Sequence, residues 1–175
     1  MNFFFGNRAL DPNLLVPAIA FLDGAIVTQR APNTFSCIVD RGGAVKLSFF
    51  GVPNLPRLLP PLIAEDTGLQ VAHLLDLAGT KASVVQLRAE AKDYLDIDAI
   101  LMDGRIDLPM AIAAAAALYG DRFNAQNTLK ALCFFDDGDL GTLPERVCDR
   151  LLLAARDVDL DHFSVILFII KSDGK

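Results

Sequence analysis

Apolar and polar positions alternate in short β-type runs in the first third of the chain and adopt helical spacing in most of the rest. β-type runs cover residues 2–6, 25–30, 34–40 and 44–51. The triplet Arg41-Gly42-Gly43 between the last two runs predicts a tight hairpin, because glycine accepts the positive φ angles of such turns. Asp11-Pro12 predicts the start of a helix that extends to Gly24. Together these elements predict a small mixed β-sheet with one helix.

Four prolines at positions 53, 56, 60 and 61 predict a connector without regular structure. A short strand is expected at 69–72, followed by helices over 77–101, 107–119, 124–135 and 143–156, the first interrupted at Gly79-Thr80. The pattern therefore predicts an α/β (α+β) fold in two parts, an α/β unit over 1–56 and a mainly helical unit over 57–175. The apolar run 163–170 predicts a buried strand, a packed terminal segment or a surface for self-association.

The polar residues of segment 77–101 recur at spacings that place them on one stripe of a helix. They stand seven, four and four residues apart: Lys81, Arg88, Lys92 and Asp96, with Asp93 and Asp98 beside them. Much of the remaining circumference is apolar, which predicts a largely buried helix. Two interpretations stay open at this point. The stripe is either a solvated face with ion pairs one turn apart, or a polar site facing a charged ligand.

Composition limits the classes of function. The chain has 175 residues, of which 53% are hydrophobic, enough for a proper core. A formal charge of −6 argues against a broad electrostatic surface for nucleic acid, so a role with nucleic acid needs a focused basic site. Neither a secretory signal nor an apolar run long enough to span a membrane is found, so we expect a cytoplasmic protein.

The residues that commonly bind metals are not arranged for it. The scattered cysteines at 37, 133 and 148 predict reduced core residues, and His73 and His162 are expected to be structural. The acidic stretch 136–139 lacks the ligand spacing of a calcium loop and predicts a solvated turn. From its residues alone, the sequence predicts no metal site.

Three groups of residues carry a resemblance to a known family. They are Leu77-Ala78-Gly79-Thr80-Lys81, then Arg88, then Lys92-Asp93-Tyr94-Leu95-Asp96. The chain resembles the AbiEii/AbiGii toxin family of nucleotidyltransferase-like proteins, in particular its short bacterial members. In that family, one helix contains a leucine, then small residues, then a lysine. An arginine follows in the sequence, and the motif ends with Arg/Lys-Asp-aromatic-x-Asp. The β-type run 44–50 is similar to the central strand of the same fold.

The resemblance implies a minimal nucleotidyltransferase fold that binds a nucleoside triphosphate with Mg²⁺ and transfers a nucleotide to an acceptor such as tRNA. It also implies a toxin of a type IV toxin–antitoxin system with an antitoxin protein as partner. By the same resemblance, Lys81 contacts phosphate and Arg88 supports that site or the acceptor. Asp93 and Asp96 orient the basic groups or assist the reaction, and Lys92 completes the nucleotide-binding set.

The sequence also departs from the family pattern. The family's Gly-rich turn and metal-binding Asp-x-Asp are not found, Asn2 stands where an acid is expected, and Ser48 offers no carboxylate on the central strand. We therefore expect an inactive chain that is N-terminally truncated or degenerate, or alternatively a non-catalytic interaction domain. The apolar beginning and tail favour a homo-oligomer in each case.

Overall fold

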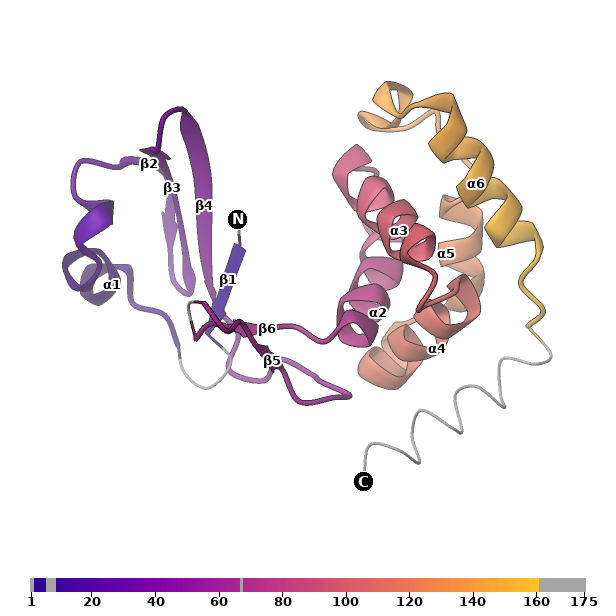
Figure 1. Ribbon diagram of the computed structural model, residues 1–175, viewed down its shortest axis with the longest axis horizontal. Helices are drawn as coiled ribbons and strands as arrows, with labels where there is room; N and C mark the ends of the chain where they lie inside the picture. Colours follow the sequence, from indigo (N-terminus) through magenta and orange to yellow (C-terminus); the bar gives the residue numbers. More distant parts are fainter. Residues whose placement is uncertain (1, 6–8, 67, 161–175) are drawn as a thin grey trace. The chain divides into compact units, whose positions relative to one another are not determined.

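The computed structural model describes residues 2–5, 9–66 and 68–160. The chain divides into two compact units, Met1–Leu55 and Pro56–Lys175, which we describe separately (Figure 1). The first is built on a sheet and the second on helices, so the predicted class, a mixed sheet followed by a mainly helical part, is confirmed.

The first unit contains a four-stranded sheet in the order β1-β4-β3-β2. Strand β1 (Asn2–Phe5) is parallel to β4 (Ala44–Gly51), whereas β3 (Thr34–Asp40) is antiparallel to both β4 and β2 (Ile26–Ala31). The predicted hairpin between β3 and β4 is confirmed. Gly42 has a φ of 78° in its turn, and Asp40 accepts a hydrogen bond from the Gly43 N–H.

One face of this sheet holds the core of the first unit. Alternate residues of β3 and β4 point to it, and they pack with residues of α1 (Pro12–Ala18) and the 3-10 helix η1 (Ala20–Leu22): Leu15, Leu22, Phe35, Cys37, Val39, Leu47 and Phe49. The expected single helix up to Gly24 is wrong. Pro17, which has no N–H to donate, precedes the last residue of α1, and Ile19 is extended before η1 begins.

The second unit begins with a two-stranded hairpin of β5 (Leu62–Ile63) and β6 (Gln70–Val71). The described residues up to 160 then form the helices α2 (Leu74–Val84), α3 (Ala91–Asp103), α4 (Leu108–Tyr119), α5 (Ala125–Ala131) and α6 (Glu145–Arg156). Short 3-10 helices η2 (Gly120–Arg122) and η3 (Leu140–Thr142) lie after α4 and before α6. Helix α2 packs against α4 through small residues, among them Ala78, Ala82, Ala111, Ala114 and Ala115.

The prediction of one polar stripe on a helix over 77–101 is wrong. The segment forms α2 and α3 with residues 85–90 between them, and the break does not fall at Gly79-Thr80. Gly79 lies inside α2, where a Cβ atom would stand 2.9 Å from the backbone carbon of Ala114, so the glycine permits close packing with α4. The start of α3 is fixed from outside the segment, because the Asp139 carboxylate accepts the Ala91 N–H.

The remaining sequence expectations have mixed outcomes. Cys37 is buried as expected, but Cys133 is exposed and Cys148 is partly exposed, so a core position is wrong for Cys133. His73 is structural, because its Nδ1 accepts the Leu75 N–H at the start of α2. His162 and the apolar run 163–170 lie outside the described residues. Among the helices described, none has the length and apolar character to cross a membrane.

Candidate functional site

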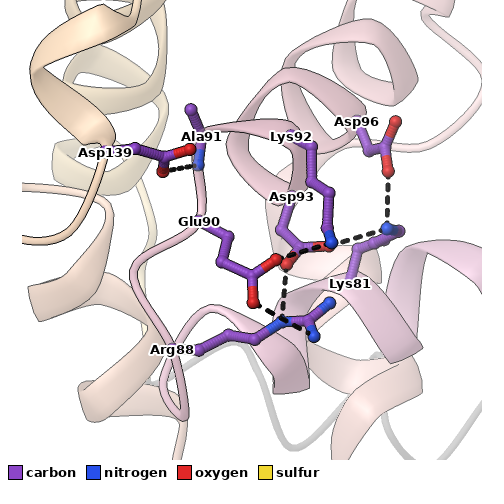
Figure 2. Close-up of polar contacts among 8 residues, drawn as sticks. All are labelled: Lys81, Arg88, Glu90, Ala91, Lys92, Asp93, Asp96 and Asp139. Carbon is purple, nitrogen blue, oxygen red and sulfur yellow. Dashed lines mark hydrogen bonds and ion pairs between the residues drawn. The ribbon is translucent and has the colours of Figure 1, made fainter. Parts of the chain in front are cut away.

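Six charged side chains gather where α2, the following loop and the start of α3 meet (Figure 2). We call them the charged cluster: Lys81 from α2, Arg88 and Glu90 from the loop, and Lys92, Asp93 and Asp96 from α3. All of them belong to the second unit. The turn of the chain between the two helices, and not a single helical face, brings these side chains together.

Asp93 lies at the centre of the charged cluster. The Lys81 ammonium donates to Asp93 Oδ1 at 2.8 Å, and Arg88 Nε donates to Asp93 Oδ2 at 2.9 Å. The Asp93 side chain is 0% exposed. Both its oxygens therefore have a charged donor, which is the condition under which a buried carboxylate is tolerated. These bonds form an inner layer that fixes Lys81 and Arg88 against each other.

The other two carboxylates form an outer layer. Asp96 lies 2.5 Å from the Lys81 ammonium, but its side chain is 51% exposed. Glu90 stands 3.4 Å from Arg88 Nη1 and 2.6 Å from the Lys92 ammonium. Ion pairs between exposed side chains contribute little, with a median of about 0–1 kcal/mol. Asp96 and Glu90 are therefore held less firmly than Asp93, which is fully buried and bonded to two cations.

The electrostatics of the inner layer keep its three groups charged. Burial acts to raise the pKa of Asp93, but the hydrogen bonds and charges of Lys81 and Arg88 outweigh it and hold that pKa below its usual range. Burial likewise opposes the charge of Lys81, yet Asp93 and Asp96 raise its pKa above the ordinary lysine value. The hydrogen bond to Asp93 also raises the pKa of Arg88. At neutral pH the inner layer is two cations on one carboxylate.

All five residues expected from the sequence lie in the charged cluster, with Glu90 as its sixth member. Asp98, which flanks the stripe in sequence, is not part of it. Its carboxylate instead receives two hydrogen bonds from Arg150 of α6, at 2.7 and 2.5 Å. Sequence spacing missed Asp139, which lies far along the chain and holds the start of α3 (Figure 2).

A resident Mg²⁺ does not fit the described residues. Within 2–5, 9–66 and 68–160, no three His, Cys, Asp or Glu side chains are grouped so that they could hold a metal ion. Both oxygens of Asp93 are already bonded to cations, and Ser48 on β4 accepts a hydrogen bond from the Ser36 hydroxyl across the sheet. A hard dication requires several free oxygen ligands, so we derive no reaction step through a metal held by these residues.

The fold places this protein in the α/β class. Its helical unit carries a lysine and an arginine that are both bonded to one buried aspartate. Comparison with protein families identifies it further. The model of the family described as "Nucleotidyl transferase AbiEii toxin, Type IV TA system" matches residues 10–163, so the chain belongs to this toxin–antitoxin family. Searches of curated proteins and of solved structures gave no match.

Proposed function

We propose that the chain binds a nucleoside triphosphate through Lys81 and Arg88, in support of nucleotide transfer to an acceptor such as tRNA. Two observations support this proposal. The family is one of nucleotidyl transferases, and the chain carries a lysine and an arginine fixed side by side on a fully buried carboxylate. Arginine and lysine are the side chains that proteins use to hold phosphate groups.

The two layers of the charged cluster suggest how phosphate enters. Lys81 has three N–H donors, and only one of them is needed for Asp93. Arg88 uses Nε for Asp93, and its side chain is 46% exposed. When phosphate oxygens replace Asp96 and Glu90, the inner layer presents two cations against one carboxylate. Asp93 would thus act as a positioning residue that keeps both basic groups in place during the exchange.

Our proposal is limited to binding and presentation of the nucleotide by this chain. The Mg²⁺ of the family's reaction would accompany the triphosphate, since the described residues do not supply its ligands. A family of type IV toxins implies an antitoxin protein as partner. A cytoplasmic location and a homo-oligomeric state are also part of the proposal.

Isothermal titration of the full chain with each ribonucleoside triphosphate, with and without Mg²⁺, tests the proposal. Replacing Lys81 by methionine removes the cation while keeping an apolar stem of similar length. We expect at least one nucleotide to bind and Lys81→Met to abolish that binding. The matched control is Lys130→Met on the exposed side of α5, which should bind as the wild type does. Equal binding by Lys81→Met would contradict a phosphate site at the charged cluster.

A non-catalytic interaction domain is the second candidate, and one observation favours it. The charged cluster contains three cations and three carboxylates that pair with one another, so its charges already balance. In this alternative the cluster only joins α2 to α3. It is supported if no nucleotide binds while Lys81→Met still lowers the free energy of unfolding.

A further inference from the structure

A cavity of about 200 Å³ lies next to the charged cluster, inside the second unit. It is lined by residues 85–89, between α2 and α3, by Ala131 at the end of α5, and by Phe134, Asp137 and Leu140 after that helix. Tyr94 of α3 contributes to the wall and donates a hydrogen bond to the Ala131 carbonyl. Arg88 lines the cavity and also belongs to the charged cluster, so the two features share one side chain.

The lining of the cavity includes exposed apolar side chains. Phe134 is 56% exposed and Leu87 is also exposed, although both are large apolar residues. Aromatic rings and arginine planes are the surfaces on which unpaired bases stack in proteins that bind nucleotides and single strands. Phe134 and Arg88 offer one of each at the same cavity.

The polar groups of the cavity favour a ring that carries hydrogen-bonding atoms. Gln86 lines it, and its Nε2 is buried without an acceptor among the described residues. Rotation about its soft terminal torsion can present the amide to the cavity. Asp137 adds a carboxylate acceptor at the border. A hydrocarbon side chain would leave the Gln86 amide unpaired, whereas the edge of a base has acceptors and donors for both groups.

The size of the cavity limits what can enter. Pockets for whole small molecules measure roughly 300–1,000 Å³, so this cavity of about 200 Å³ has room for a ring but not for a complete nucleotide. The sugar and phosphates would remain outside, and Arg88 is the cavity residue that leads to the charged cluster.

We propose that this cavity receives the base of a nucleotide whose phosphate lies at Arg88, with Phe134 stacking on the base and Gln86 and Asp137 contacting its edge. This inference rests on the proposed function. It goes further by stating where the base binds and which residues select it. The base belongs either to the nucleoside triphosphate or to an unpaired end of the acceptor RNA. The chemistry is the same in both cases, and the experiment separates them.

The test compares ligands with and without a base on the full chain. Isothermal titration in the presence of Mg²⁺ uses the ribonucleoside triphosphates, inorganic tripolyphosphate and a short single-stranded oligoribonucleotide. Phe134→Ala should weaken binding of the nucleoside triphosphate or of the oligoribonucleotide at least about fivefold and leave tripolyphosphate unchanged. The ligand that loses affinity identifies the source of the base. Leu153→Ala is the control, because Leu153 is 62% exposed on α6 and does not line the cavity.

A second variant guards against a purely structural explanation. Gln86→Leu removes a buried amide nitrogen without a partner, so the thermal midpoint should stay or rise while affinity for the same base-containing ligand falls. Unchanged affinity of both variants for the nucleoside triphosphates and the oligoribonucleotide would overturn the cavity proposal. The proposed function fails separately, if Lys81→Met leaves tripolyphosphate binding as it is in the wild type.

Discussion

Asp139 caps helix α3 from a position 48 residues beyond Ala91, whose backbone N–H donates to Asp139 Oδ1 at 2.6 Å. The acidic loop 136–139 is exposed, as a solvated turn should be, but this carboxylate has a specific partner in the second unit. Because α3 carries Asp93 two residues further on, the contact also fixes the central carboxylate of the charged cluster (Figure 2). A negative charge at the start of a helix is favourable as well.

Asp139→Ala should lower the free energy of unfolding by about 1 kcal/mol, the usual cost of losing an N-terminal cap. Urea unfolding followed by far-UV circular dichroism measures it. Asp136→Ala, in the same exposed loop, is the matched control and should lie within about 0.5 kcal/mol of the wild type. Equal losses for the two variants would mean that the loop acts only through its total charge.

Gly138, next to Asp139 in the same loop, lies against the backbone of Ala89, where a larger residue does not fit. Its φ is +55°, and a Cβ atom would stand 2.0 Å from the Ala89 carbonyl oxygen. Gly138→Ala should therefore destabilise the protein by about 2–4 kcal/mol, since a backbone clash adds to the strain of a positive φ. Gly120 also has a φ of +55°, but nothing lies within 4 Å of a Cβ atom there, so Gly120→Ala adds backbone strain without a clash. Chemical denaturation of both should show the larger loss for Gly138→Ala, and similar losses would argue against the close approach.

Local patterns in the sequence predicted the strands of the first unit, the Gly42-Gly43 hairpin and the start of α4, because glycine turns and the Asp107 cap act over a few residues, but they did not predict β5. The break between α2 and α3 was misplaced for the opposite reason. Residues 85–90 contain no glycine or proline, and the contact that starts α3 comes from Asp139. The spacing did pick out Lys81, Arg88, Lys92 and Asp96, four of the six members of the charged cluster, although they lie on two helices and a loop and not on one helical face. It could not show that Asp93 is buried at the centre.

Replacing Gly79 by alanine should have two opposite effects on stability, one from helix propensity and one from packing. Alanine is a better helix former by about 1 kcal/mol, so a free helix would gain from Gly79→Ala. In α2 the added Cβ atom would lie 2.9 Å from backbone and side-chain atoms of Ala114, and overpacking of this kind costs about 1–3 kcal/mol. We expect a net loss of about 1–2 kcal/mol in thermal unfolding monitored by circular dichroism. Gly141→Ala, where a Cβ atom meets nothing within 4 Å, should be neutral or stabilising.

The two carboxylates bonded to Lys81 should differ sharply when each is replaced by its amide. Asp93→Asn removes the charge from a fully buried group with two charged donors, and a loss of about 2–4 kcal/mol in the free energy of unfolding is expected. Asp96→Asn touches a half-exposed pair and should cost less than about 1 kcal/mol. Urea titrations of both variants at neutral pH measure the difference. Comparable losses would contradict the division into an inner and an outer layer.

The contribution of Asp93 should also depend on pH with a definite sign. Lys81 and Arg88 hold its pKa below the ordinary value of 3.8, so the folded state binds this proton less readily than the unfolded state. The stabilisation is therefore fully present above 3.8 and is lost as the pH falls through the lower pKa of the folded protein. Lys81 behaves in the opposite direction, because its raised pKa means that its contribution is lost only as the pH rises above 10.5.

Unfolding free energies of the wild type and Asp93→Asn, measured in urea across a pH series, test this dependence. The difference between them should be constant from about pH 5 to 7 and shrink below pH 3.8, because the protonated aspartic acid and the amide are both neutral. A difference that keeps its neutral value at the lowest pH of cooperative unfolding would show that Asp93 stabilises the protein by its shape and not by its charge.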